Sequence, residues 1–294
     1  MLIDFHAHIG RVSQERKESL EASQIISRLD EWGIDKACVL ALSETPEGNY
    51  LEADTEDVLR ECSHFPKRLI PFCLIDPRFG LNSPDMDFTF LLEEYVARGC
   101  RGIGELLPKM SIDDPRCLNL FHQAGRFKLP VVIDLHSRPV SYGLEDAPGL
   151  PGLERVLRVC PETIIVGHGP TFWAEISGQV SAEERQGYPS GPVKPGGAVP
   201  RLMKTYPNLF ADLSAGSGYN ALTRDLSFGL DFLEAFQDKL LFGTDYCVRS
   251  HTRNEVKIID FFHRLKQEKL ISLDAWEKIA WKNAARLLNY DRKN

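Results

Sequence analysis

The stretch that decides the fold is residues 2–9, LIDFHAHI, a short apolar run that contains two histidines two positions apart. Residues two apart on a β-strand share a face, so His6 and His8 are expected to point the same way. Seven further apolar runs of similar length follow along the chain. Together the eight runs cover residues 2–9, 37–43, 69–76, 100–106, 130–136, 163–168, 209–214 and 240–247.

The spacing of these runs predicts a repeated strand-helix unit. Successive runs begin 30 to 35 residues apart, with one exception of 46, and a βαβ unit takes roughly 30 residues. Apolar residues recur at helical spacing between the runs, as in residues 20–29, 90–96 and 118–124. Eight such units predict an α/β protein with a (β/α)₈ TIM barrel, one domain covering residues 1–294. The alternative is an open doubly wound sheet, but that fold more often has a glycine-rich phosphate loop after its first strand.

The longest spacing, 46 residues, lies between the sixth and seventh strands. Residues 178–197 within it are rich in Gly and Pro, which do not support a long regular element. In a barrel this connection lies over the mouth, so it predicts an enlarged loop that acts as a lid or sets specificity. After the eighth strand, helical patterns at residues 254–269 and 273–289 predict extra C-terminal helices.

Composition indicates in which compartment the protein works and which kinds of partner it lacks. A net charge of −7 disfavours a general surface for nucleic acid or anionic membranes, and no apolar run approaches the roughly 18 residues of a membrane span. The chain opens on the first strand without signal-peptide features, and its seven cysteines are scattered singly, which is typical of a reducing compartment. We therefore expect a soluble, cytoplasmic protein that acts on a small molecule, without nucleic-acid or membrane partners. A homo-oligomer is compatible with the sequence.

Several predicted strands end in a residue that can bind a metal ion. Taken singly, an acidic residue there can cap the next helix and a histidine can be a hydrogen-bonded core residue. The carboxyl ends of barrel strands meet at one mouth, however, so a divalent metal centre explains all of these residues together. The candidate ligands are His6, His8, Glu105, His136, His168 and Asp245.

These positions resemble the amidohydrolase superfamily, in particular the amidohydrolase-2 group of metal-dependent TIM-barrel hydrolases related to aminocarboxymuconate-semialdehyde decarboxylase. That superfamily has H-x-H on strand one, a Lys or Glu bridge on strand four of binuclear sites, His on strands five and six, and Asp on strand eight. The six candidate ligands stand at the matching positions. Residues 282–288, KNAARLL, resemble the closing helix of the group, so the resemblance runs from end to end.

The resemblance leaves the number of metal ions open. The decarboxylase group typically uses one ion and employs the strand-six histidine as an acid/base, whereas Glu105 here offers a bridging ligand and favours two ions. We expect Zn²⁺, with Mn²⁺ as the alternative, because imidazole and carboxylate groups bind both.

The ligand set predicts a hydrolase in which a metal-bound hydroxide attacks an amide, lactone or ester carbonyl. Asp245 is expected to act as general base, and His168 either binds a second ion or donates a hydrogen bond to the developing oxyanion. The alternative activity is non-oxidative, metal-dependent decarboxylation of an unsaturated or aromatic carboxylic acid. A non-catalytic metal protein is disfavoured, because structural metal sites usually have closed four-ligand shells.

Other polar residues lie near the expected mouth. Asp212, on the seventh strand, either orients a metal ligand or makes a structural hydrogen bond, and Asp134 is expected to support the site without ligating. Basic residues on the loops after strands one, four, five and eight suit a substrate carboxylate. These are Arg11, Lys109, Arg138 and Arg249, together with His251.

Overall fold

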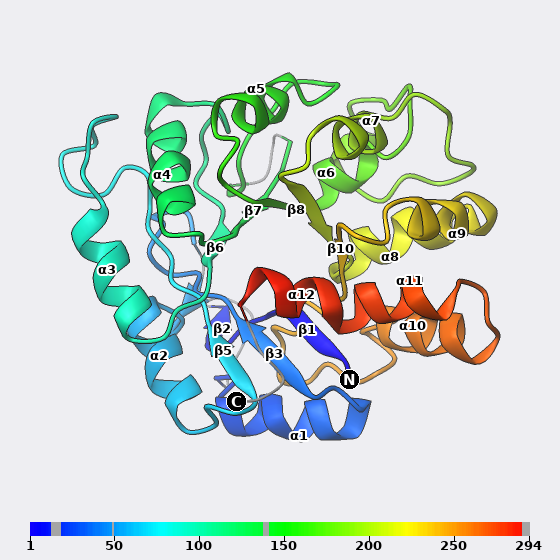
Figure 1. The fold of residues 1–294 in the computed structure, drawn as a ribbon, viewed down its shortest axis with the longest axis horizontal. Coiled ribbons are helices and arrows are strands. Elements are labelled where there is room, and N and C mark those ends of the chain that lie inside the picture. Colours follow the sequence, from blue (N-terminus) through cyan, green and yellow to red (C-terminus); the bar gives the residue numbers. More distant parts are fainter. Residues whose placement is uncertain (13–18, 49, 138–140, 290–294) are drawn as a thin grey trace.

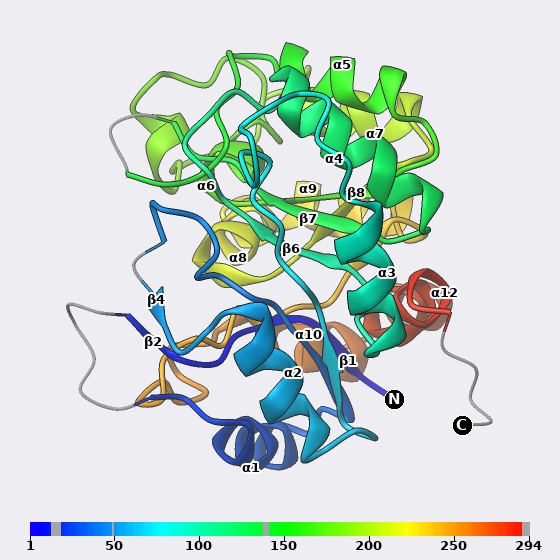
Figure 2. The same cartoon turned by 90° about the vertical axis from the view of Figure 1, so that its left-hand side faces the viewer.

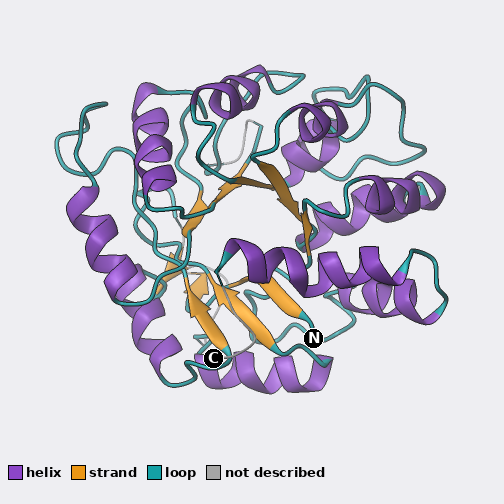
Figure 3. Ribbon diagram, viewed as in Figure 1, coloured by secondary structure: helices purple, strands orange, loops and turns teal. Residues whose placement is uncertain are grey.

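The computed structural model describes residues 1–12, 19–48, 50–137 and 141–289, which form a ring of parallel strands surrounded by helices (Figure 1, Figure 3). Each barrel strand overlaps one of the eight predicted apolar runs. The barrel strands are β1 (Ile3–Ala7), β3 (Lys36–Val39), β5 (Leu69–Pro71), β6 (Ile103–Leu106), β7 (Val131–Asp134), β8 (Ile165–His168), β9 (Leu209–Asp212) and β10 (Leu240–Leu241). A short antiparallel pair, β2 (Arg11–Val12) with β4 (Tyr50–Leu51), lies outside the ring.

Hydrogen bonds close the ring at both of its seams. The strands pair in the parallel orders β1-β3-β5 and β6-β7-β8-β9-β10. Cys73 bridges to Ile103 between the β5 and β6 sides. Between β1 and the end of β10, Ala7 bridges to Tyr246, and the His8 N–H donates to the Tyr246 carbonyl at 2.9 Å. The predicted TIM barrel is therefore confirmed over the open doubly wound sheet, which would have two unpaired edges.

The helices cover the outside of the barrel in the expected alternation. Predicted helix signals are visible at their ends: α1 ends at Gly33 in the left-handed conformation, with φ of 71°, and α4 begins with Pro115 after the capping residue Asp114. The helices are α1 (Ala22–Trp32), α2 (Thr55–Ser63), α3 (Thr89–Ala97), α4 (Pro115–Arg126), α5 (Pro151–Val159), α6 (Pro170–Ala174), α7 (Ala198–Thr205), α8 (Ala215–Thr223), α9 (Leu226–Ala235), α10 (Ile258–Gln267), α11 (Leu273–Glu277) and α12 (Asn283–Leu287).

The last helices close one end of the barrel. The predicted pattern at residues 273–289 forms α11, a π-helical turn (Lys278–Lys282) and α12 in succession. Side chains of α12 pack with Phe5, Phe72, Val132 and Phe210, which are nearly or fully buried. The N-terminus and α12 lie at this end of the barrel, whereas β2, β4 and α6 lie toward the opposite end (Figure 2). The opposite end is the mouth, where the barrel strands finish.

The enlarged connection between β8 and β9 is confirmed, and a buried ion pair holds it in place. Nε of Arg185 donates to Oε1 of Glu175 at 2.7 Å, and both side chains are 7% exposed. Nη2 of the same arginine donates to the carbonyl oxygens of Asp146 and Ala147 at 3.2 Å each, which ties the loop to the segment before α5. Such a buried, hydrogen-bonded pair fixes one arrangement of the loop, because breaking it would leave an unpaired charge.

The structure also bears on two other expectations, one about membrane-spanning helices and one about the cysteines. Across the parts of the sequence that the structure describes, no helix combines the length and apolar character needed to span a bilayer. The six cysteines other than Cys247 are buried and form no disulfide.

Candidate metal centre

The ends of the strands bring histidine and carboxylate side chains together at the mouth of the barrel. His6 and His8 of β1 share a face, as predicted, and their Nε2 atoms lie 2.9 Å apart. Glu105 of β6 places Oε2 at 3.5 Å from each of these nitrogens. All three residues are buried, and their potential ligand atoms lie within 4.8 Å of one another. They form the first candidate metal-binding group.

Asp245, directly after β10, lies beside this group without being one of its three members. Its Oδ1 lies 3.3 Å from Nε2 of His8 and 3.9 Å from Nε2 of His6. The backbone of Asp245 is left-handed, with φ of 55°, and its N–H donates to the His6 carbonyl at 2.7 Å. Aspartate tolerates this conformation better than most residues. The side chain is 27% exposed, so Asp245 is a carboxylate beside the group that a substrate could reach.

A second candidate group shares Glu105 with the first. It consists of Glu105, Asp134 and His168, whose ligand atoms also lie within 4.8 Å of one another. Nε2 of His168 is 3.6 Å from Oε1 of Glu105. The two oxygens of Glu105 therefore face different histidines, which is the arrangement that a bridging carboxylate needs.

Asp212 of β9 orients two of the histidines. Its Oδ2 lies 2.9 Å from Nδ1 of His6, and its Oδ1 lies 3.1 Å from Nδ1 of His168. These contacts fit the orienting role considered for Asp212, which stays a prediction. Potential ligand atoms of Asp212, His6 and His168 lie within 4.8 Å of one another, so these three residues form a third buried group. Nδ1 of His8 is fixed in a similar way by the carbonyl of Leu40 at 3.0 Å.

These hydrogen bonds show that the site fits a cation. A neutral imidazole that donates from Nδ1 carries a lone pair on Nε2, so His6 and His8 direct two lone pairs at each other across 2.9 Å. Oδ1 of Asp134 is buried and has no hydrogen-bond partner among the described residues. Neutral imidazole nitrogens and carboxylate oxygens together are a donor set for a divalent metal ion.

The electrostatics of the group point the same way. Burial alone would lower the pKa of His6, but the negative charges of Asp212 and Glu105 outweigh it and raise the pKa well above its usual value. Burial opposes ionisation of Glu105, yet the neighbouring His6, His168 and His8 lower its pKa to about 2. Asp134 has a strongly raised pKa, first because of its burial and then because of the Glu105 charge. The pocket thus attracts positive charge, whether as protons or as a metal ion.

The two polar residues of the fifth predicted strand, Asp134 and His136, lie differently from what the sequence led us to expect. Asp134, expected only to support the site, belongs to the second group, while His136 belongs to none of the groups found among the described residues. The chain leaves the barrel after Asp134, because Leu135 bridges to Leu144 and the His136 N–H donates to the Leu144 carbonyl. His136 still borders the centre, with Nε2 at 3.4 Å from Oδ1 of Asp134.

Two of the basic residues expected to bind substrate lie close to carboxylates of the protein. Nε of Arg11 lies 3.6 Å from Glu52, and Nζ of Lys109 lies 3.2 Å from Glu145. Arg249 is exposed, and Arg138 falls outside the described residues.

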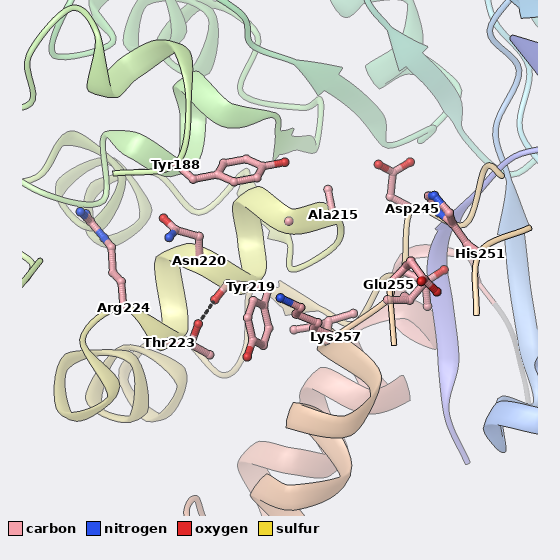
Figure 4. Close-up of a pocket in the computed structure, with 14 residues that line it drawn as sticks. Tyr188, Ala215, Tyr219, Asn220, Thr223, Arg224, Asp245, His251, Glu255 and Lys257 are labelled. Atoms are coloured by element: carbon pink, nitrogen blue, oxygen red, sulfur yellow. Dashed lines mark hydrogen bonds between the residues drawn. The ribbon is translucent and has the colours of Figure 1, made fainter. Parts of the chain in front are cut away.

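A cavity of about 470 Å³ opens beside Asp245 (Figure 4). Of the proposed basic residues that the structure describes, His251 alone is among its lining residues. The sequence reasoning missed Tyr188, Arg224 and Lys257, which also line it. Arg224 follows α8 rather than a strand, so no strand-end pattern could have identified it.

The closed (β/α)₈ barrel gathers at its mouth histidines and carboxylates that could hold a metal ion. A family model described as Amidohydrolase matches residues 3–290. The chain therefore belongs to the amidohydrolase family, as the resemblance implied. No curated protein matches the sequence.

Solved structures of similar proteins include both hydrolases and decarboxylases. One is a probable 2-pyrone-4,6-dicarboxylic acid hydrolase from Acinetobacter baumannii with citric acid bound (15% identity, 98% of this chain and 99% of that chain covered, TM-score 0.62). Another is an amidohydrolase from Burkholderia multivorans with bound zinc (14%, 98% and 99%, TM-score 0.63). A third is 5-carboxyvanillate decarboxylase from Sphingomonas paucimobilis (13%, 98% and 98%, TM-score 0.58). At these identities the likeness shows the shared TIM-barrel fold.

Proposed function

We propose that this protein is a metal-dependent hydrolase that cleaves an amide, lactone or ester bond of a small molecule. The observation that carries the proposal is the position of Glu105, whose two oxygens face two separate groups of ligand atoms. Sites with this kind of shared carboxylate suit two ions, and paired ions favour attack of water on a carbonyl.

The ligand atoms divide between the two groups. His6, His8 and Glu105 would hold one ion, with Asp245 on its open side, and Glu105, Asp134 and His168 would hold the other. Zn²⁺ is the ion that imidazole and carboxylate ligands suit best, with Mn²⁺ as the alternative. A divalent ion held by these residues would polarise a substrate carbonyl and would lower the pKa of a bound water to about 7.

The side chains then have distinct tasks. Asp245 combines closeness to the histidines with exposure to the cavity, so it can accept a proton from water and pass it to the leaving group. Asp212 holds His6 and His168 in fixed orientations through their Nδ1 atoms. The loop between β8 and β9 brings Tyr188 over the cavity, which restricts the shape of the substrate.

Decarboxylation is the competing activity, because a solved decarboxylase shares this fold. The two reactions incorporate atoms from the solvent at different positions of the product. Hydrolysis places one water oxygen in the new carboxyl group, whereas decarboxylation releases CO₂ and places a solvent proton on carbon.

A product assay in labelled solvent tests the proposal. The metal-loaded protein is incubated with panels of lactones, aryl esters, N-acyl amides and hydroxybenzoates in H₂¹⁸O and, separately, in D₂O. We expect turnover in the first three panels, with one ¹⁸O in the acid product and no CO₂. Release of CO₂ with deuterium on the product carbon, and no hydrolysis, would establish the decarboxylase alternative.

A further inference from the structure

We propose that Asp4, acting through Thr244, is a positioning residue for Asp245. A buried network of hydrogen bonds that ends on the Asp4 carboxylate holds the turn at Asp245 against β1. The inference rests on the proposed function for the role of Asp245 as general base. It deepens that function by naming two residues on which the role depends, although they carry none of the chemistry.

Asp4 is a carboxylate of β1 that lies entirely inside the protein, with 0% of its surface exposed. Its Oδ1 accepts the backbone N–H groups of His6 at 3.0 Å and of Thr244 at 2.9 Å. Its Oδ2 accepts the hydroxyl group of Thr244 at 2.5 Å. A buried polar group is costly unless it is hydrogen-bonded, and these three bonds meet that need. They also join β1 to the segment after β10, 240 positions later in the sequence.

The two N–H groups that Asp4 binds are those that the strand pairing leaves out. The N–H of Phe5 donates to the carbonyl of Phe242 at 2.8 Å, and the N–H of Asp245 donates to the carbonyl of His6 at 2.7 Å. In a regular parallel ladder Thr244, two residues after Phe242, would be the next donor. The shift by one residue places Asp245 in the ladder instead. The displaced N–H groups need another acceptor because they are buried, and the carboxylate supplies it.

The hydroxyl group of Thr244 extends the network to the other side of Asp245. Besides donating to Asp4, its oxygen accepts the N–H of Tyr246 at 3.1 Å. Asp245 between them has a left-handed backbone, with φ of 55°, which costs free energy in a residue that has a Cβ atom. Hydrogen bonds on both sides therefore hold a turn that would otherwise relax. The result is the approach of Oδ1 of Asp245 to Nε2 of His8, at 3.3 Å.

Neither Asp4 nor the hydroxyl group of Thr244 needs to touch a substrate. Thr244 borders the cavity, but it is only 3% exposed, and its hydroxyl group is already engaged as donor and as acceptor. Asp4 is fully buried and binds the backbone of His6 rather than its ring. Asp4 can therefore influence the reaction only through the residues that it holds in place.

Replacing Thr244 with valine tests the network, because valine keeps the branched shape and removes the hydroxyl group. We expect kcat to fall by about 10- to 100-fold, since a small displacement of a catalytic group has effects of this size. KM and bound metal should stay within about twofold of wild type, because the ligands on β1 remain in place. Thr244→Ser keeps the hydroxyl group and should restore most of the turnover. The substrate is the one that the labelled-solvent assay identifies.

A double-mutant cycle separates positioning from a general structural role. If Thr244 acts through Asp245, Thr244→Val should lower turnover by less than about twofold further in Asp245→Asn, where the base is already lost. Asp4→Asn keeps an oxygen for the two N–H groups but presents an amide to the Thr244 hydroxyl, and it should show the same non-additivity. Thr205→Val, at an exposed position of α7, is the matched control and should behave as wild type.

The visible spectrum of the Co²⁺-loaded protein gives a readout that does not require turnover. We expect Thr244→Val and Asp4→Asn to change this spectrum, and to change it little when Asp245 is already asparagine. Thermal midpoints measured on the same preparations show whether each variant is folded. Spectra of both single variants identical to wild type would overturn the inference, as would losses in turnover of equal size with and without Asp245.

Failure of the proposed function looks different from failure of this inference. If the labelled-solvent assay shows decarboxylation, hydrolysis is refuted, but the cycle is then measured on decarboxylation and its non-additivity still supports the positioning role. If hydrolysis is confirmed while Asp4→Asn and Thr244→Val keep wild-type turnover, only the positioning role is refuted.

Discussion

Turnover should fall by about 10²- to 10⁴-fold when Asp245 is replaced by asparagine, the range expected for loss of a general base. Asparagine keeps a coordinating oxygen and nearly the same volume, but it cannot accept the proton of water. The left-handed backbone at Asp245 does not complicate this test, because asparagine also tolerates positive φ. Metal content should therefore fall only modestly while turnover collapses.

The measurement is turnover and metal content on one preparation of Asp245→Asn. Asp231→Asn is the matched control, because Asp231 is exposed on α9 and the same chemical change there should leave both quantities unaltered. A fully metallated Asp245→Asn protein with wild-type turnover would rule out Asp245 as the base. Loss of all metal would show that Asp245 acts chiefly as a ligand.

Replacing His168 with asparagine should remove about half of the bound metal and lower turnover at least 100-fold. His168 faces Glu105 through Nε2 and belongs to the group that contains Asp134, so its loss dismantles one group and leaves His6 and His8 in place. The alternative role for His168, as an acid/base or oxyanion donor, predicts full metal content with collapsed activity.

Elemental analysis and turnover of His168→Asn decide between these roles. His122→Asn, an exposed histidine on α4, serves as control. If His168→Asn retains both its metal and its activity, neither role is correct. Because metal binding to a folded site stabilises the protein, a lower unfolding temperature that extra metal partly restores would support the ligand role.

The barrel could be predicted from the sequence because the same pattern of an apolar run followed by a helical segment occurs eight times. Eight apolar runs at nearly constant spacing constrain the topology far more than any single segment does. Strand ends were less certain: β10 covers only Leu240–Leu241, although the apolar run continues to residue 247. The chain turns there and forms the segment that carries Asp245, so hydrophobicity alone does not show where hydrogen bonding between strands stops.

The candidate site was predicted in part. His6, His8, Glu105, His168 and Asp245 come together because the carboxyl ends of parallel strands share one mouth. The sequence could not show that Asp134, rather than His136, lies within a group of close potential ligand atoms, because this depends on the point where β7 ends. Period-two alternation puts both residues on one face, and only the pairing of Leu135 with Leu144 distinguishes their depths.

Recognition of the substrate was the least predictable part. The sequence pointed to cations directly after strands, yet two of them are paired with carboxylates in the structure. Arg224, which lines the cavity, lies at the end of α8 rather than after a strand. Its place beside the cavity arises from the packing of segments distant in sequence, so no local pattern reveals it.

The central claim, that a divalent metal centre at the barrel mouth performs the chemistry, is tested most directly by elemental analysis combined with turnover. Protein purified without chelator should contain Zn²⁺ or Mn²⁺, two ions per chain if Glu105 bridges. Activity should disappear on chelation and return when the ion is restored. One ion per chain would remove the bridging role of Glu105 and keep the metal centre. Metal-free protein with full activity would contradict the account.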